Sequence, residues 1–210
     1  MPTVVVGANG KDVGKTALVC AVVAALPEFA WTAVKLRGHD YESAGRGSIS
    51  SADFQPVIHE ELSAGQETDT ARYLAAGARR ALLVTRSGPN VPIDEIRSAI
   101  GEDRNIIFES NRIVDVIKPD VCLALVGDNT ERKPSFERLL RKADAVVSVG
   151  ADSFNSHPSH DVAVKWMGHP SVGDEAEDAG DVVRRFRLQS VDQLSPEMAN
   201  WLRERLVALY

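Results

Sequence analysis

The sequence predicts an α/β fold in which helices cover both faces of a doubly wound, mainly parallel sheet, giving three layers. Short apolar runs rich in β-branched residues alternate with helical patterns along most of the chain. The first of these runs leads into a glycine-rich stretch and then into an apolar helical pattern. No shift in composition divides the 210 residues, so we expect a single domain over 1–210.

The first strand is expected over Thr3–Val6, and the first helix over Thr16–Leu26, before a proline. The stretch between them reads Gly7-Ala-Asn-Gly-Lys-Asp-Val-Gly-Lys-Thr16. Backbone N–H groups at the start of a helix bind phosphate oxygens, so this stretch predicts a phosphate-binding loop. Within it, Lys15 is expected to reach the terminal phosphates and the Thr16 hydroxyl to bind Mg²⁺.

The whole loop is predicted to hold a nucleotide through Asn9, Gly10, Lys11, Asp12, Val13, Gly14, Lys15, Thr16 and Ala17. In the pattern G-x-x-x-x-G-K-T, Asn9 takes the place of the first glycine, and asparagine tolerates the positive φ that such a turn requires. The alternative is an ordinary glycine-rich turn with a chance Gly-Lys-Thr. For the Lys11 side chain, a solvated loop lysine is the simpler interpretation.

The second strand, Trp31–Leu36, carries polar side chains at its end. Ligands of open parallel sheets bind at the carboxyl ends of the strands, where both this strand end and the phosphate loop are expected. Lys35 is predicted to act in catalysis by neutralising phosphate charge, and Asp40 to serve Mg²⁺ or a nucleophile. His39 is predicted to contact a substrate. A solvated loop is the alternative for all three.

Residues 42–68 form a long Ser-, Gly- and Glu-rich connection with a short strand-like piece at Pro56–His59, which we interpret as a substrate flap or insertion. A helix is expected over Asp69–Arg80. Asp69 and Arg72 share a face near its start and are candidate substrate contacts. Their alternative is a helix cap and a surface ion pair.

Further alternation of strands and helices completes the predicted sheet. Strands are expected over 81–85, 105–110, 121–126 and 145–149, and helices over 93–100, 135–142 and 195–210, with an irregular region over 151–194. Glu109 ends an apolar strand, so it is predicted to hold Mg²⁺ through a water or to orient an attacking water. An acid facing solvent is the alternative.

The amino-acid composition limits the classes of binding partner to expect and indicates the cellular compartment of the protein. The net charge of −6 argues against a broad nucleic-acid or anionic-membrane surface. Cys20 and Cys122 lie far apart in apolar segments, which indicates buried thiols and a reducing compartment. With no export signal and no apolar segment long enough to span a membrane, we expect a cytoplasmic protein.

Together these motifs resemble the MobB family of small P-loop NTPases associated with molybdopterin guanine dinucleotide biosynthesis. The resemblance lies in the phosphate loop, Val34-Lys35 with His39-Asp40, Asp69-Thr-Ala-Arg72 with Ala76-Gly-Ala78, and Ile107-Phe-Glu109. It implies a homodimer that binds GTP or ATP with Mg²⁺ and serves a nucleotidyltransferase as an adapter. It also implies phosphate and Mg²⁺ contacts for Lys15 and Thr16, the strand-end acid role for Glu109, and a polar site including Asp69 and Arg72.

A weaker resemblance, to dethiobiotin synthetase, lies in Val13-Gly-Lys-Thr16 and in the strand-end Lys35. It implies ATP-dependent activation of a small carboxylated substrate, so a small-molecule kinase or ligase is the alternative to an accessory NTPase with slow hydrolysis. The base preference stays open. No Asn-Lys-x-Asp guanine motif is present, and Arg141-Lys-Ala-Asp144 is interpreted as a helix end.

Overall fold

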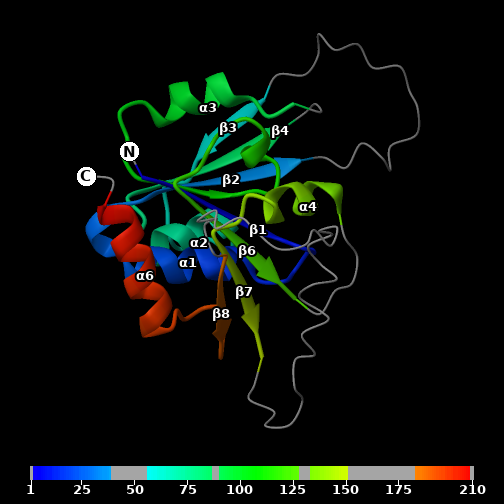
Figure 1. The fold of residues 1–210 in the computed structure, drawn as a ribbon. Helices are drawn as coiled ribbons and strands as arrows, with labels where there is room; N and C mark the ends of the chain where they lie inside the picture. Colours follow the sequence, from blue (N-terminus) through cyan, green and yellow to red (C-terminus); the bar gives the residue numbers. More distant parts are fainter. Residues whose placement is uncertain (1, 39–55, 87–89, 128–132, 151–182, 209–210) are drawn as a thin grey trace, which may run out of the picture.

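An eight-stranded sheet forms the centre of the computed structural model, which describes residues 2–38, 56–86, 90–127, 133–150 and 183–208 (Figure 1). The strand order is β3-β4-β2-β5-β1-β6-β7-β8, and every neighbouring pair is parallel except β3 with β4. The strands are β1 (Thr3–Ala8), β2 (Thr32–Gly38), β3 (Val57–Glu60), β4 (Arg80–Arg86), β5 (Ile106–Glu109), β6 (Val121–Val126), β7 (Ala145–Val149) and β8 (Arg184–Leu188).

Helices cover both faces of this sheet. The α-helices are α1 (Lys15–Ala25), α2 (Asp69–Ala75), α3 (Ile93–Ile100), α4 (Pro134–Leu140) and α6 (Pro196–Val207), and the 3₁₀ turns are η1 (Pro27–Phe29) and η3 (Ile113–Asp115). Buried residues of α1, α2 and α6 join one apolar cluster, and those of α3, α4 and η3 join another. The predicted three-layer, doubly wound, mainly parallel α/β fold is confirmed (Figure 1).

The first strand shows why its sequence is apolar throughout. Val4 and Val6 of β1 face the cluster with α1, whereas Val5 faces the opposite cluster, and all three side chains are fully buried. Successive side chains of a strand point to opposite faces, so a strand covered on both sides reads as an unbroken apolar run. The central position of β1 places the loop that follows it in the middle of the sheet's carboxyl edge.

The largest differences from the predicted elements occur in two places, while several strand ends shift by one or two residues; β1 and β2 each run two residues further than predicted, to Ala8 and Gly38. The helix predicted over Asp69–Arg80 ends at Ala75, because Gly77 adopts a positive φ of 104° and the chain turns towards β4. The predicted irregular region over 151–194 contains β8, which pairs in parallel with β7. Its arginine-rich sequence obscured the strand, because only Phe186 and Leu188 of β8 are buried.

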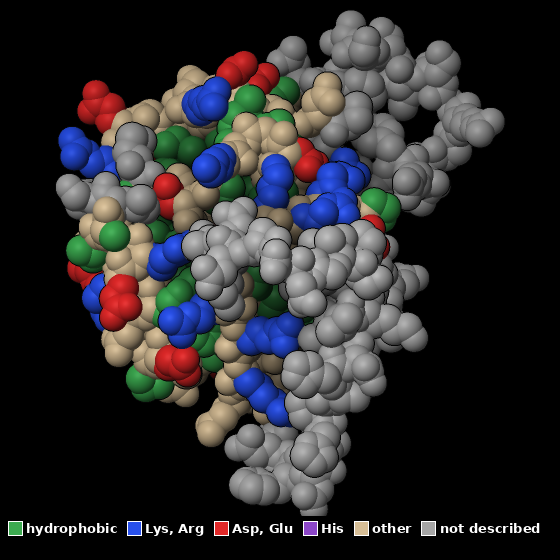
Figure 2. Space-filling model, in the orientation of Figure 1, with side chains coloured by type: hydrophobic (Ala, Val, Ile, Leu, Met, Phe, Trp, Pro, Cys, Tyr) green, Lys and Arg blue, Asp and Glu red, His purple; other side chains and the backbone are tan. Residues whose placement is uncertain are grey.

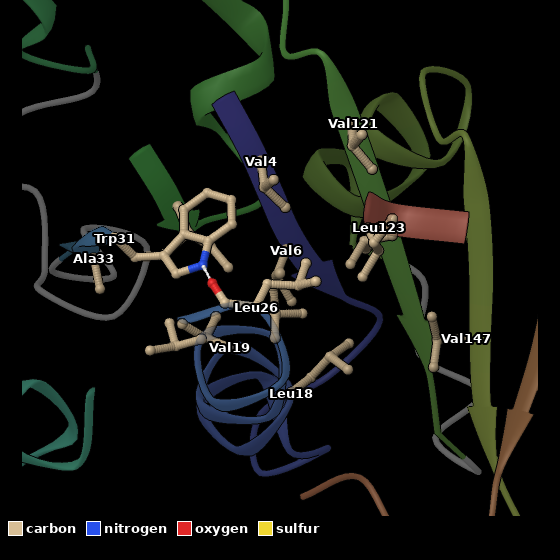
Figure 3. Close-up of a cluster of buried hydrophobic side chains, with 14 of the residues drawn as sticks. Val4, Val6, Leu18, Val19, Leu26, Trp31, Ala33, Val121, Leu123 and Val147 are labelled. Carbon is tan, nitrogen blue, oxygen red and sulfur yellow. Dashed lines mark hydrogen bonds between the residues drawn. The ribbon is translucent and has the colours of Figure 1, made fainter. Parts of the chain in front are cut away.

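Trp31 anchors the start of β2 in the apolar cluster beneath α1. Its side chain is fully buried, and its Nε1 donates a hydrogen bond to the carbonyl of Leu26 at 2.9 Å (Figure 3). The indole also stacks on Phe29, with ring centroids 5.2 Å apart. The tryptophan therefore ties the end of the first βα unit to the strand that carries Lys35.

Trp31→Phe is expected to lower the free energy of unfolding by about 1–3 kcal/mol, because the Leu26 carbonyl loses its donor and the smaller ring leaves a void. Urea unfolding monitored by circular dichroism measures this change. Trp201→Phe is the matched control, since Trp201 is only partly buried and should cost less. Equal losses in the two variants would contradict the anchoring role of Trp31.

Candidate functional site

The register of three neighbouring strands brings the predicted site residues together. Val6 of β1 and Lys35 of β2 are both paired in parallel with Glu109 at the end of β5. Because parallel strands end at the same edge of a sheet, Lys35 and Glu109 lie beside the loop that follows β1. This loop leads into α1, whose first turn contains Lys15 and Thr16.

The loop reaches the helix through two residues with positive φ, Asp12 at 57° and Gly14 at 103°. Asn9, where the sequence suggested the positive φ of a missing glycine, does not adopt one. Gly14 is the N-cap of α1 and no side chain caps this end, whereas Ser195 caps α6 and Thr68 caps α2. The first turn of α1 therefore begins without a side-chain cap, as the predicted phosphate loop requires.

Asn9 has a different role from the one that its place in the motif suggests. Its amide group donates to the Gly127 carbonyl and accepts from the Gly127 N–H, both at 3.0 Å, which fastens the loop to the end of β6. Gly127 is also pressed against Val13, where a Cβ would lie 2.6 Å from Cγ1. The loop is therefore held by contacts between residues more than a hundred positions apart.

Asn9→Ala is expected to lower the free energy of unfolding by about 1–3 kcal/mol, because the partly buried backbone groups of Gly127 lose both of these side-chain hydrogen bonds. Chemical unfolding of the variant and the wild type gives the difference. Asn200→Ala provides a control in which an exposed amide is removed from α6, and it should change stability by less than about 0.5 kcal/mol. An Asn9→Ala protein as stable as the Asn200→Ala protein would refute the fastening role.

Lys15 lies folded back over the loop that carries it. Its Nζ donates to the Gly10 carbonyl at 2.8 Å. Burial lowers the pKa of Lys15, Glu109 acts in the opposite direction, and the positive charges of Lys35 and Lys133 lower the pKa further. The loop thus gathers positive charge in a partly desolvated place, which favours an anionic ligand. Lys133, at the start of α4, is a charge that the sequence patterns did not point to.

Glu109 is the centre of a polar cluster that we call the Glu109 cluster: Thr16, Lys35, Asp69, Tyr73 and Glu109. The Glu109 side chain is 5% exposed, whereas that of Asp69, at the rim of the cluster, is 42% exposed. Oε1 accepts from Lys35 Nζ at 2.8 Å, and Oε2 accepts from Thr16 Oγ1 at 2.7 Å and from the Tyr73 hydroxyl. Glu109 does not face solvent, the alternative that its strand-end position left open.

Tyr73 is the member of the cluster that sequence reasoning missed. It lies four residues after Asp69 on α2, so both residues are on the helix face that meets α1 and β5. Burial raises the pKa of Tyr73 well above its ordinary value, and the neighbouring Glu109 charge adds to this effect. Tyr73 therefore stays a hydrogen-bond donor at neutral pH. In the sequence it reads only as one apolar position of a helix.

The predicted substrate residues divide into three groups. Asp69 lies in the cluster, 2.6 Å from Lys35 Nζ. Burial alone would raise the pKa of Asp69, but the hydrogen bond and charge of Lys35 outweigh it and lower that pKa. Arg72 lies outside the cluster, about half exposed and 3.9 Å from Asp69. His39 and Asp40, with residues 42–55 of the predicted flap, fall outside the described residues.

The donor set of the cluster fits Mg²⁺ better than a softer metal. Thr16 offers a hydroxyl and Glu109 a carboxylate, and Mg²⁺ prefers oxygen ligands, with one or two carboxylates and substrate phosphates completing its shell. No group of three His, Cys, Asp or Glu side chains able to hold a metal occurs among the described residues. A metal here would depend on phosphate oxygens, as it does in phosphoryl-transfer sites.

Other surface features lie away from this site. A hollow lined by Asp120, Trp201 and Glu204 lies near the amino end of β6, and therefore at the opposite edge of the sheet. Acidic and basic side chains are interspersed on the face drawn in Figure 2. Across the described part of the chain, helices are too short or too polar to cross a membrane.

The stretch predicted as a phosphate loop joins the central strand to the first helix, with Lys35 on β2 and Glu109 at the end of β5 beside it, which is the arrangement of the P-loop NTPase fold. No protein-family model matches the chain, and no curated protein matches it significantly. Among solved structures, it is similar to the structure of Bacillus subtilis MobB, with 98% of each chain covered, 15% sequence identity and a TM-score of 0.38.

Proposed function

We propose that this protein binds a nucleoside triphosphate, GTP or ATP, together with Mg²⁺ and hydrolyses it slowly. The phosphates would lie over the loop of residues 9–17, with Lys15 contacting the terminal phosphates. Thr16 and Glu109 would hold Mg²⁺, which neutralises charge on the phosphates when bound.

The observation that carries this proposal is the pairing of Thr16 with Glu109. The threonine that ends the phosphate-loop motif donates to the strand-end acid at 2.7 Å, although the two are 93 residues apart. The alternative interpretation of the motif, a glycine-rich turn with a chance Gly-Lys-Thr, gives no reason for a buried carboxylate beside the threonine. Burying that carboxylate is costly unless it is fully paired, so its presence here suits a functional site.

We further propose that the protein is an accessory factor of molybdenum cofactor biosynthesis. This part rests on the resemblance of its motifs to the MobB family, in which nucleotide binding serves a partner enzyme. A homodimer and a nucleotidyltransferase partner belong to the same proposal. Bound nucleotide would then act on the partner through segments next to the phosphates.

A small-molecule kinase or ligase is the second candidate function, and the position of Lys35 favours it. The Lys35 ammonium lies within reach of both the Thr16 hydroxyl, at 3.3 Å, and the Asp69 carboxylate, at 2.6 Å. A lysine so placed beside the phosphate loop would stabilise negative charge on a transferring phosphoryl group. Asp69 would then help to place the acceptor.

Calorimetric titration with Mg²⁺ and non-hydrolysable GTP and ATP analogues tests the proposal, followed by turnover of the preferred nucleotide. Binding of GTP with negligible turnover alone supports the accessory factor, especially if a molybdopterin nucleotidyltransferase accelerates turnover. Preference for ATP, with turnover that rises only on adding a small carboxylated acceptor, supports the kinase or ligase. Binding of neither analogue by the folded protein would refute both.

A further inference from the structure

The ammonium of Lys35 lies among three oxygen atoms from three different elements. Its Nζ is 2.8 Å from Glu109 Oε1 of β5, 2.6 Å from Asp69 Oδ2 of α2 and 3.3 Å from Thr16 Oγ1 of α1. The side chain is only 17% exposed. Lys35 is therefore seated as a cation would be, between two carboxylates and a hydroxyl.

Two of these three oxygens belong to the residues proposed to hold Mg²⁺. Thr16 and Glu109 are members of the phosphate loop and of the neighbouring strand end, and both are buried. A lysine ammonium and a divalent cation are attracted by the same carboxylate charge, so they compete for one position. In the structure, the Lys35 ammonium occupies that position.

A nucleotide would change this balance. Its phosphates bring several negative charges to the loop beside Lys35, which lets the ammonium move from the carboxylates to phosphate oxygens. The oxygens it leaves, and the phosphates themselves, then complete the shell of a metal ion. Without a nucleotide, the Lys35 ammonium would lose its two carboxylate partners without gaining phosphate oxygens in their place.

We propose that Lys35 is an internal counter-ion that excludes divalent cations from Thr16, Asp69 and Glu109 until a nucleotide is bound. This proposal rests on the proposed function. In this proposal the Asp69 carboxylate, on α2, holds the Lys35 ammonium in place, and it is one of the groups that the lysine keeps from binding a metal ion. Metal and nucleotide would bind together, and in the free protein the two carboxylates would share the single positive charge of Lys35.

The role of Lys35 is tested by metal binding without nucleotide, with Mn²⁺ as the probe and its free concentration followed by electron paramagnetic resonance. Lys35→Met keeps the length of the side chain and removes its charge, so the full-length variant should bind Mn²⁺ at least about tenfold more tightly than the wild type. Lys35→Arg keeps the charge and should bind as weakly as the wild type. Lys118→Met, which removes an exposed lysine before β6, is the matched control and should leave Mn²⁺ binding unchanged.

A folded Lys35→Met protein with the Mn²⁺ affinity of the wild type would overturn the proposal. So would a Lys35→Arg protein that gains as much affinity as Lys35→Met, since charge would then not be the cause. Adding Asp69→Asn to Lys35→Met should remove most of the gain, and a full gain in the double variant would exclude Asp69. Failure of the wild type to bind nucleotide would refute the proposed function by itself, while the Mn²⁺ comparison still decides whether Lys35 keeps a cation out.

Discussion

Lys15→Ala is expected to weaken binding of the preferred nucleotide analogue by about 10- to 150-fold. A hydrogen bond to a charged group contributes about 1.5–3 kcal/mol, and the lysine is the side chain of the loop placed to reach the terminal phosphates. The substitution should leave the fold intact, because Lys15 Nζ donates to the Gly10 carbonyl of its own loop rather than to a distant element among the described residues. Calorimetric titration in the presence of Mg²⁺ measures the change.

The control for this variant is Lys118→Ala, which removes an equal charge from an exposed position at the other edge of the sheet. It separates the loss of a specific contact from the loss of overall positive charge. Thermal unfolding of both variants checks that the fold is retained. Unchanged nucleotide affinity in folded Lys15→Ala would refute the phosphate-loop interpretation, and with it both candidate functions.

Glu109→Gln is expected to remove most of the Mg²⁺-dependent part of nucleotide binding, a loss on the order of 10- to 100-fold in the presence of the metal. The amide has almost the same shape as the carboxylate and still accepts hydrogen bonds through its oxygen, so packing against Tyr73 is retained. What it lacks is the negative charge that attracts the cation. Titrations with Mg²⁺ and with a chelator, on the variant and the wild type, give the metal-dependent difference.

Glu102→Gln serves as the isosteric control, since Glu102 is exposed in the turn after α3, away from the carboxyl edge of the sheet. Binding in the chelator should be the same or slightly tighter in Glu109→Gln, because a negative charge has been removed beside the phosphates. If the Mg²⁺-dependent increment were unchanged in the folded variant, Glu109 would have no part in holding the metal.

The Glu109 cluster links the phosphate loop to α2, whose two cluster residues lie one turn apart. Asp69 contacts Lys35, and Tyr73 contacts Glu109, so a change at the metal side of the site reaches this helix directly. Just before α2, the buried Glu61 accepts hydrogen bonds from Thr68 and Thr70, which fixes the helix start. The Glu109 cluster thus joins the start of α1 to α2, whose own start is held by Glu61.

The local sequence determined the order of the strands and helices apart from β8, and it predicted the phosphate loop. A run such as Val4–Val6 is apolar at every position because both faces of its strand are covered, and Gly14 with Lys15 and Thr16 is a short-range pattern that carries its own geometry. For the same reason the strands that carry Lys35 and Glu109 were predicted, but Lys35 lies inside β2, which continues to Gly38, and only Glu109 ends its strand. These features depend on neighbours within a few residues, so they can be read from the chain alone.

Only the tertiary structure decided which of these residues meet. Three sets of contacts join residues far apart in sequence. Tyr73 contacts Glu109, Asn9 is hydrogen-bonded to Gly127, and the Lys35 ammonium lies among three oxygen atoms. Strand β8 was missed for a related reason, since its place beside β7, rather than its arginine-rich pattern, makes it a strand. Hydrogen bonding and charge pairing are short-range in space but indifferent to sequence separation, so strand order and register had to be known first.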